Sequence, residues 1–213
     1  MGPGAREVKR RTYDSSSRKG AADARRNATL DAAYDAFIRD GYAATTVESV
    51  ATAAGVSAAT IYKTYGGKAG LMRLLVERAL AGEGAVPAEQ RSNAMRNTGD
   101  AHALVAAWGN LAAEVSPRGS PLLLLLQHVA AIDDEAAALL ADLEERRLAR
   151  MHDNARALKD LGYLRAGVSV KEARDVLWFA TAPETYDLLI VRRTWTRKQF
   201  AAFITQTITA ALL

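Results

Sequence analysis

The sequence predicts an all-α protein with an N-terminal three-helix helix-turn-helix domain and a larger C-terminal helical domain. Apolar residues recur at three- and four-residue spacing along most of the 213 residues, which is typical of amphipathic helices. No segment alternates apolar and polar residues between turn residues, as a half-buried strand would. Glycine and proline separate short helical segments before residue 82 from longer ones after it.

The N-terminal segments carry start and stop signals for helices. Gly41 can end the first helix, and the pair Thr45-Thr46 can cap the second. Gly55 can take a positive φ in a three-residue turn, Ser57 can cap the next helix, and Gly66 can end it. The expected helices span residues 22–40, 47–54, 58–65 and 68–80.

The C-terminal part is expected to contain five further helices, over residues 100–115, 121–131, 133–161, 170–192 and 196–212. Pro117 is expected to separate the first two of these, and Pro183 to kink or interrupt the fourth. Residues 82–99 contain Gly84, Pro87 and many polar side chains, so we expect a linker there.

Positive charge is concentrated at the N-terminus. Residues 1–83 hold 13 Lys and Arg against 9 Asp and Glu, whereas residues 84–213 hold 15 of each. The expected domains are a basic, disordered arm over residues 1–21, the helix-turn-helix domain over residues 22–82, and a helical effector-binding and dimerisation domain over residues 83–213. The arm either contacts phosphates or is a solvated tail.

Composition excludes several classes of function. The chain has no cysteine, which removes disulfides, thiolate metal sites and a cysteine nucleophile. It also lacks a signal-peptide pattern and an apolar run of about 20 residues, so we expect a cytoplasmic protein that does not enter a membrane. His102, His128 and His152 have no metal-ligand spacing, so neither a metal, a cofactor nor catalysis is expected.

The segment over residues 44–82 fits a helix-turn-helix, in which the second helix lies in the major groove of DNA. Ala51 is small enough for close helix packing, and Gly55 makes the turn. Three apolar side chains can fill the space between the helices: Val50, Val56 and Ile61. The side chains left outward on the second helix are short, polar or cationic: Ser57, Ala58, Thr60, Lys63 and Thr64.

These residues, together with their neighbours, resemble the tetracycline-repressor (TetR) family over about residues 28–82. The matching stretches are Thr45-Thr46-Val47-Glu48-Ser49-Val50-Ala51, Ala54-Gly55-Val56-Ser57, Thr60-Ile61-Tyr62, Tyr65, Lys68 and Leu71. The segments Val176-Leu177-Trp178, Pro183-Glu184-Thr185-Tyr186 and Arg193-Thr194-Trp195 also resemble members of this family. The sequence departs from the family pattern at Ala59, Thr64, Gly66-Gly67 and Ala69-Gly70, which leaves the operator sequence open.

The resemblance implies DNA contacts at named positions. Thr46 and Tyr62 would contact phosphates, and Lys68 would face a phosphate together with the start of its helix. Core packing is the alternative for Tyr62, and the expected role for Tyr65. The complete set of expected DNA-binding residues is Thr45, Thr46, Ser57, Ala58, Thr60, Tyr62, Lys63 and Lys68.

A palindromic operator requires a two-fold protein, so we expect a homodimer. Mostly apolar side chains of the last two helices are the expected interface, with burial inside one chain as the alternative: Val176, Leu177, Phe179, Ala180, Tyr186, Leu189, Ile190, Arg193, Phe200, Phe203, Ile204, Thr207, Ile208 and Leu212.

The C-terminal domain is also expected to bind a small, mostly apolar effector. The expected lining residues, each of which has core packing as its alternative, are Trp108, Leu111, Leu124, Gln127, His128, Met151 and Trp178. The sequence thus predicts a ligand-released transcriptional repressor. The alternatives are a nonspecific architectural DNA-binding protein and an all-α enzyme.

Overall fold

The computed structural model describes residues 15–97 and 99–213, and every regular element in them is helical, which confirms the predicted all-α fold. The elements are α1 (Ser15–Ala44), α2 (Val47–Ala54), α3 (Ala58–Tyr65), α4 (Lys68–Ala81), α5 (Ala88–Met95), α6 (Ala101–Val129), α7 (Asp134–Asp160), α8 (Val170–Ala180), α9 (Pro183–Tyr186), the π-helical turn η1 (Asp187–Val191) and α10 (Arg197–Leu212). None of these helices is both long enough and apolar enough to cross a membrane.

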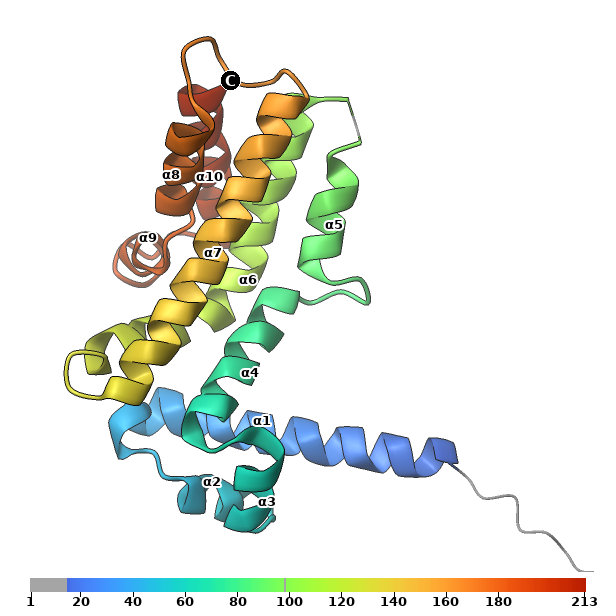
Figure 1. Ribbon diagram of the computed structural model, residues 1–213, viewed down its shortest axis with the longest axis vertical. Helices are drawn as coiled ribbons and strands as arrows, with labels where there is room; N and C mark the ends of the chain where they lie inside the picture. The colour runs from blue at the N-terminus through green and yellow to red at the C-terminus, as the bar shows by residue number, and fades with distance from the viewer. Residues whose placement is uncertain (1–14, 98) are drawn as a thin grey trace, which may run out of the picture.

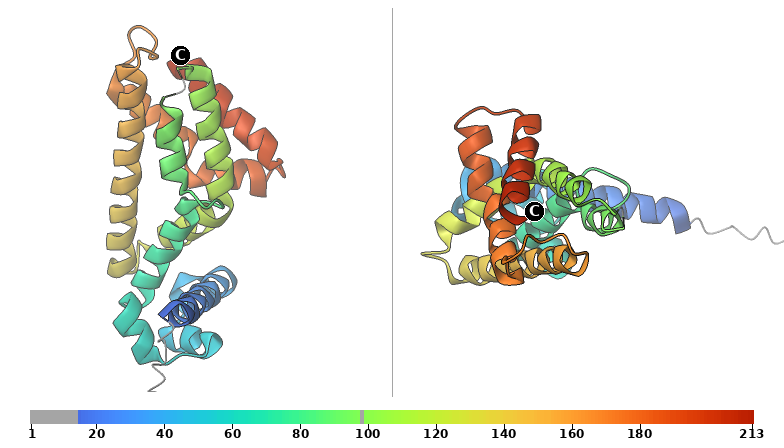
Figure 2. Two further views of the ribbon diagram at one scale, coloured as in Figure 1. Left: turned by 90° about the vertical axis from the view of Figure 1, so that its right-hand side faces the viewer. Right: turned by 90° about the horizontal axis from the view of Figure 1, so that it is seen from above.

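The helices form two parts joined by α4 (Figure 1). Helices α1, α2 and α3 lie at one end of the molecule, and α4 leads from them to a bundle made by α5–α10. In the left view of Figure 2 the long helices α6 and α7 run along this bundle, and α10 packs on α6 while α8 packs on α7. The predicted division into a small N-terminal and a larger C-terminal helical domain is therefore observed.

Two hydrophobic cores meet along α6. The lower core joins buried residues of α1–α4 to the second half of α6 and the first half of α7, including Leu126, Val129 and Leu139. The upper core joins the first half of α6 to the second half of α7, α8 and α10. The helix-turn-helix domain therefore shares its core with one corner of the C-terminal domain.

Helix α1 is longer than expected, since it begins at Ser15 rather than at residue 22. The seven residues from Ser15 to Ala21, which were expected in the basic arm, are part of this helix. The remainder of the arm, residues 1–14, lies outside the described residues. Gly41 interrupts the helix as expected, with φ of 82°.

Residues 82–99 were expected to be a linker, but they contain α5. Ala88 and Ser92 of α5 are buried, and the Trp108 indole Nε1 donates a hydrogen bond of 3.0 Å to Ser92 Oγ. Arg91 forms an ion pair with Glu114 of α6. The helix is one short polar segment held by tertiary contacts, so its sequence has little apolar periodicity to reveal it.

The expected break at Pro117 is wrong, because α6 is one helix that contains both Pro117 and Pro121. Each proline removes one backbone hydrogen bond, and α6 changes direction between its upper and lower parts in Figure 1. The upper part is fixed in one core by Leu104 and Trp108, and the lower part in the other by Leu122. Packing at both ends keeps the helix continuous.

The segment over residues 170–192 is interrupted, as expected at Pro183. Helix α8 ends at Ala180, and Pro183 is the first residue of α9, where its missing N–H costs nothing. The π-helical turn η1 follows directly. The single helix predicted here is therefore three consecutive helical pieces.

Candidate nucleic-acid interface

Local capping fixes both ends of the turn between α2 and α3. The Ser49 amide donates to Thr46 Oγ1 at 3.1 Å, and the Thr46 amide donates to Ser49 Oγ at 3.3 Å, which makes a capping box at the start of α2. Gly55 ends α2 with φ of 65°, and the Thr60 amide donates to Ser57 Oγ at 3.1 Å at the start of α3. The predicted helix-turn-helix is therefore observed.

The contact between α2 and α3 is apolar, as expected. Val50, Ala51 and Ile61 are buried, and Val56 packs against them while half-buried. Because these side chains occupy the inner faces of both helices, the outer face of α3 is fixed in its orientation.

The outer face of α3 brings together most of the residues expected to read DNA. Ser57, Thr60 and Lys63 are exposed, and Tyr62 exposes 55% of its surface. The hydroxyl oxygens of Ser57 and Thr60 lie 2.8 Å apart, so they share one hydrogen bond and keep a donor for a partner outside the protein. Ala58 differs from them, because it is half-buried and packs against the core.

Thr45 does not belong to this surface. Its side chain is 2% exposed, and its Oγ1 donates a 2.7 Å hydrogen bond to the Gly41 carbonyl. The Gly41 carbonyl also accepts a 3.3 Å hydrogen bond from the Thr45 amide, so both hydrogen-bond donors of Thr45 are used inside the protein where α1 is interrupted. Thr46, by contrast, is exposed at the start of α2.

Lys68 is the first residue of α4 and points toward the end of α1. Its Nζ donates a 3.2 Å hydrogen bond to the Tyr42 carbonyl and lies 4.3 Å from the centre of the Tyr42 ring. Gly67, which precedes α4, supplies no side-chain cap, and the Tyr62 ring packs beside it. The start of α4 thus lies between two aromatic rings.

Gly70 is a structural requirement that the sequence reasoning missed. A Cβ at this position would lie 1.6 Å from the Tyr65 carbonyl oxygen, so only glycine allows α3 and α4 to approach this closely. Tyr65 itself is half-buried against the core, the role expected for it. The sequence signal that could have revealed this requirement is a glycine inside the first turn of a predicted helix, where glycine has no local advantage over other residues.

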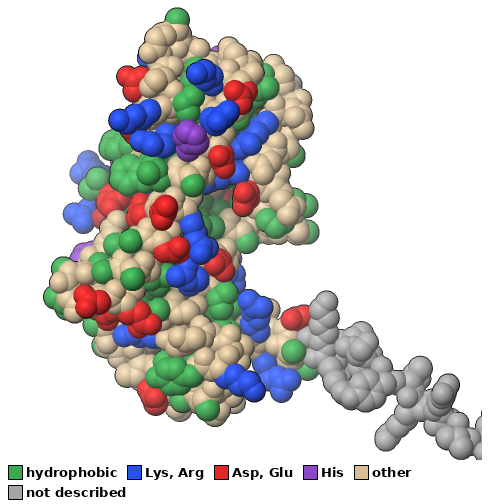
Figure 3. Space-filling view, in the orientation of Figure 1, with side chains coloured by type: hydrophobic (Ala, Val, Ile, Leu, Met, Phe, Trp, Pro, Cys, Tyr) green, Lys and Arg blue, Asp and Glu red, His purple; other side chains and the backbone are tan. Residues whose placement is uncertain are grey.

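Charge on this end of the molecule is uneven. On the face drawn in Figure 3, Lys and Arg side chains gather near α1, while Asp and Glu side chains gather at the corner between α6 and α7. Arg25 and Arg26 of α1 are exposed, and neither was expected to be a DNA contact individually. The basic side chains thus lie on the same domain as the exposed face of α3.

The seven residues expected to line an effector pocket do not surround one cavity. Trp108 is buried in the upper core, and Met151 packs against the same core. Trp178 is 38% exposed, and His128 is exposed with its Nδ1 2.6 Å from the Leu124 carbonyl. Gln127 donates to Glu184 Oε1 at 2.8 Å, and Leu111 and Leu124 are half-buried.

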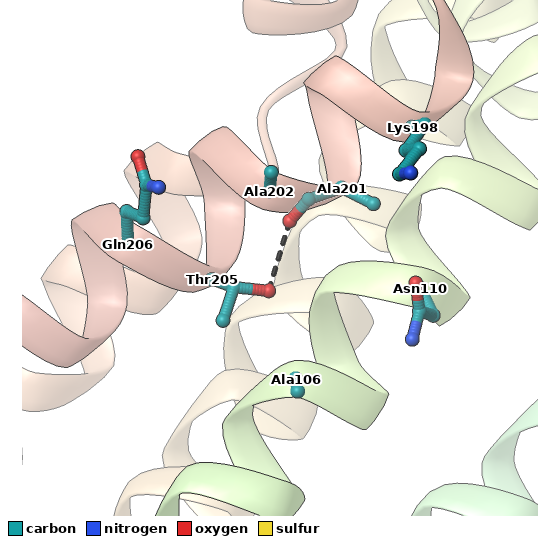
Figure 4. A pocket seen from close by; sticks show the side chains of 7 residues that line it. All are labelled: Ala106, Asn110, Lys198, Ala201, Ala202, Thr205 and Gln206. Carbon is teal, nitrogen blue, oxygen red and sulfur yellow. Dashed lines mark hydrogen bonds between the residues drawn. The ribbon is translucent and has the colours of Figure 1, made fainter.

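Two open hollows lie elsewhere on the C-terminal domain. One, of 280 Å³, lies between α6 and α10, and Figure 4 shows its lining of Ala106, Asn110, Lys198, Ala201, Ala202, Thr205 and Gln206. The other, of 570 Å³, lies between α7 and α8 and includes Glu144, Leu148, Trp178 and Phe179. Only Trp178 among the expected pocket residues lines either hollow.

The side of the larger hollow is stiffened by Arg147. Its guanidinium lies 4.8 Å from the centre of the Trp178 ring and pairs with Glu144, whose carboxylate accepts a 3.2 Å hydrogen bond from Trp178 Nε1. Burial lowers the pKa of Arg147, and the Glu144 charge opposes that shift. Within the described residues, no three His, Asp or Glu side chains gather as metal ligands.

The capped turn, the exposed second helix and the larger helical domain define the class of this fold: a helix-turn-helix domain joined to a helical bundle. Residues 30–75 match the family described as bacterial regulatory proteins, tetR family. The N-terminal domain is therefore of the TetR type, which confirms the resemblance seen in the sequence. No curated protein matches the sequence.

About nine tenths of the chain shares its fold with solved structures of bacterial regulators. NalD of Pseudomonas aeruginosa, the secondary repressor of the MexAB-OprM multidrug efflux pump, is 17% identical with a TM-score of 0.72, and the match covers 91% of this chain and 98% of NalD. SmeT in complex with triclosan is 22% identical with a TM-score of 0.69, covering 89% and 92%. The fatty acid degradation regulator FadR of Bacillus halodurans is 15% identical with a TM-score of 0.63, covering 87% and 94%.

Proposed function

We propose that this protein is a repressor that binds a palindromic operator as a homodimer and is released by a small, mostly apolar effector. The observation that carries the proposal is the exposed outer face of α3, held on a capped and packed helix-turn-helix. Thr60 and Lys63 would contact base edges with Ser57 and Ala58 beside them, and Thr46, Tyr62 and Lys68 would contact phosphates.

The DNA-binding proposal is tested by selecting bound duplexes from a random library at near-physiological salt. If the selected sequence is palindromic and binds two chains, the proposal is supported. If no sequence is enriched, the result contradicts the proposal in favour of a nonspecific architectural protein.

On the selected operator, Lys63→Ala or Thr60→Ala should relax base preference by about 1–3 kcal/mol per lost contact. Lys68→Ala should instead weaken binding to every sequence alike. Equal losses on all sequences for all three variants would contradict the assigned reading face.

The proposed dimer interface is centred on α8 and η1. Trp178, Phe179, Leu188 and Val191 expose large apolar surfaces there, with Phe179 63% exposed. The expected contribution of α10 is smaller than its sequence indicates, because its apolar stripe is buried inside the chain: Phe200, Ile204, Ile208 and Leu212. In α8, Leu177 and Ala180 are buried in the same way.

Phe179→Glu tests this interface, since it places a charge in a surface that the dimer would bury. Sedimentation velocity should show the wild type as a dimer and the variant as a monomer. Ile132→Glu is the matched control, because Ile132 is 83% exposed at the far corner between α6 and α7. A variant Phe179→Glu that stays dimeric would place the interface elsewhere.

We infer that the effector binds beside Trp108, which is buried, and Met151, which is half-buried against the same upper core where α6 and α7 meet. Because α6 continues from this core into the core of the helix-turn-helix domain, a ligand that displaces its upper half would also move α3. Screening apolar compounds should yield one that raises the melting temperature and weakens operator binding. A broad library without any such compound would contradict this part of the proposal.

A further inference from the structure

Lys68 has an unusual electrostatic position. It is the first residue of α4, where the unpaired backbone N–H groups carry partial positive charge, so a cation there is unfavourable. Within the described part of the chain no carboxylate forms an ion pair with it. The free N–H groups and the ammonium together favour an anion from outside the chain.

The ammonium is nevertheless held in place by one residue. The Tyr42 carbonyl accepts its hydrogen bond at 3.2 Å, and the Tyr42 ring lies under it at 4.3 Å. A carbonyl dipole and a ring face attract a cation without neutralising it. Both contacts come from the residue that follows Gly41, so Tyr42 connects the end of α1 to the start of α4.

Tyr42 is in turn held by the C-terminal domain. Its side chain is 2% exposed, stacks on Phe37 with ring centres 5.5 Å apart, and belongs to the core that contains Leu126 and Val129 of α6. Its hydroxyl has no hydrogen-bond partner among the described residues. Burial raises the pKa of this hydroxyl, and the charges of Glu135 and Asp133 at the start of α7 raise it further.

We propose that Tyr42 is a positioning residue for the Lys68 phosphate contact. The ring and carbonyl of Tyr42 keep the ammonium beside the free N–H groups of α4, so that both face the same DNA phosphate. This inference rests on the proposed DNA-binding function.

The test is the salt dependence of binding to a mixed-sequence duplex of about 30 base pairs, roughly three helical turns. Lys68→Ala should weaken binding about tenfold and reduce the slope of log affinity against log salt by about one unit, the loss of one phosphate contact. Tyr42→Leu should do the same, and the double variant should lose no more than either single variant. Both Tyr42 variants keep the backbone carbonyl, so the ring is the contact that they test: Tyr42→Phe keeps the ring and should retain the wild-type slope.

Two controls separate positioning from folding. Leu126→Ala damages the same core without touching Lys68, so it should lower the melting temperature and keep the slope. In the free protein, the Lys68 methylene protons should show an upfield ring-current shift in the NMR spectra of the wild type and Tyr42→Phe, which Tyr42→Leu removes. A normal slope in Tyr42→Leu, or losses that add in the double variant, would overturn the role of Tyr42. A wild type that binds no DNA would contradict the proposed function itself.

Discussion

The helix-turn-helix and the C-terminal domain are held in shape by different kinds of contact. In the first, hydrogen bonds within three residues and left-handed glycines define where helices end, as at Thr46, Gly55 and Ser57. In the second, distant contacts override local signals: α6 continues through its prolines, and α5 is held by Trp108 and Glu114. Local rules therefore specify the part proposed to contact DNA, and packing specifies the part proposed to sense a ligand.

The largest expected effects come from the two glycines at which helices touch. Gly70→Ala places a Cβ 1.6 Å from the Tyr65 carbonyl oxygen, and Gly109→Ala places one 2.3 Å from Thr205 Oγ1 in α10. We expect each substitution to lower the free energy of unfolding by about 3 kcal/mol, with the larger loss at Gly70. Alanine by itself favours a helix over glycine by about 1 kcal/mol, but the steric clash outweighs this gain. Urea unfolding followed by circular dichroism measures the loss.

The two variants should also differ in what they damage. Gly70→Ala should abolish DNA binding while the C-terminal helices stay folded, whereas Gly109→Ala should loosen α6 against α10. The control is Gly119→Ala in α6, where a Cβ would meet Ala79 at an ordinary 3.7 Å and should be neutral or stabilising by up to about 1 kcal/mol. Comparable destabilisation in all three variants would contradict the close-contact explanation.

An intermediate effect should come from removing one cap in each domain. Ser57→Ala deletes the hydroxyl that accepts from the Thr60 amide, and Thr196→Ala deletes the equivalent cap of α10. We expect a loss of about 1 kcal/mol at Ser57 and about 0.5 kcal/mol at Thr196, because packing holds α10 more strongly than α3. Hydrogen exchange of the amides in each helix measures the local loss. A greater loss at Thr196 would break the contrast between the domains.

The smallest effect should come from the ion pairs between α4 and α7. The Arg73 hydrogen bond and the nearby Arg146 charge lower the pKa of Asp142, although partial burial opposes this. Because the folded-state pKa lies below the unfolded value of about 3.9, the ion pairs stabilise the fold above that pH and are lost as pH falls through the folded pKa.

Asp142→Asn should accordingly flatten the acid side of the stability profile. Below about pH 4 the wild type should lose more of its melting temperature than the variant does, and high salt should shrink the difference because both partners are more than one third exposed. Identical acid profiles for the two proteins would show that this ion pair does not link α4 to α7.

The sequence predicted the helix-turn-helix closely because its signals are local. The expected helices at residues 47–54 and 58–65 match α2 and α3. Ser57 is the observed cap of α3, and Thr46, one of the two threonines expected to cap α2, is the observed one there. Thr45 was misassigned to the DNA surface because a threonine before a helix resembles a cap whether or not it is buried. Gly70 was missed because its partner, Tyr65, belongs to another helix.

The C-terminal domain was less predictable because its features depend on what packs where. Proline at residue 117 indicates a helix break unless tertiary packing holds both halves of the helix. The sequence does not show whether that packing exists. The residues expected to line a pocket were chosen by their residue type along the chain. In the structure, some of their side chains point into a core, one points at a backbone carbonyl, and others point outward. The sequence of an apolar stripe such as that of α10 likewise does not reveal whether the same chain or a second chain covers the stripe.

The passage of α6 through both hydrophobic cores restricts how the gene can change in length. Adding or deleting one residue within α6 would rotate one half of the helix by about 100° relative to the other, and would turn Leu126 away from one core or Leu104 away from the other. Insertions between α4 and α5 would leave both cores unchanged. Descendants of this sequence should therefore vary in length at that connection and keep α6 constant.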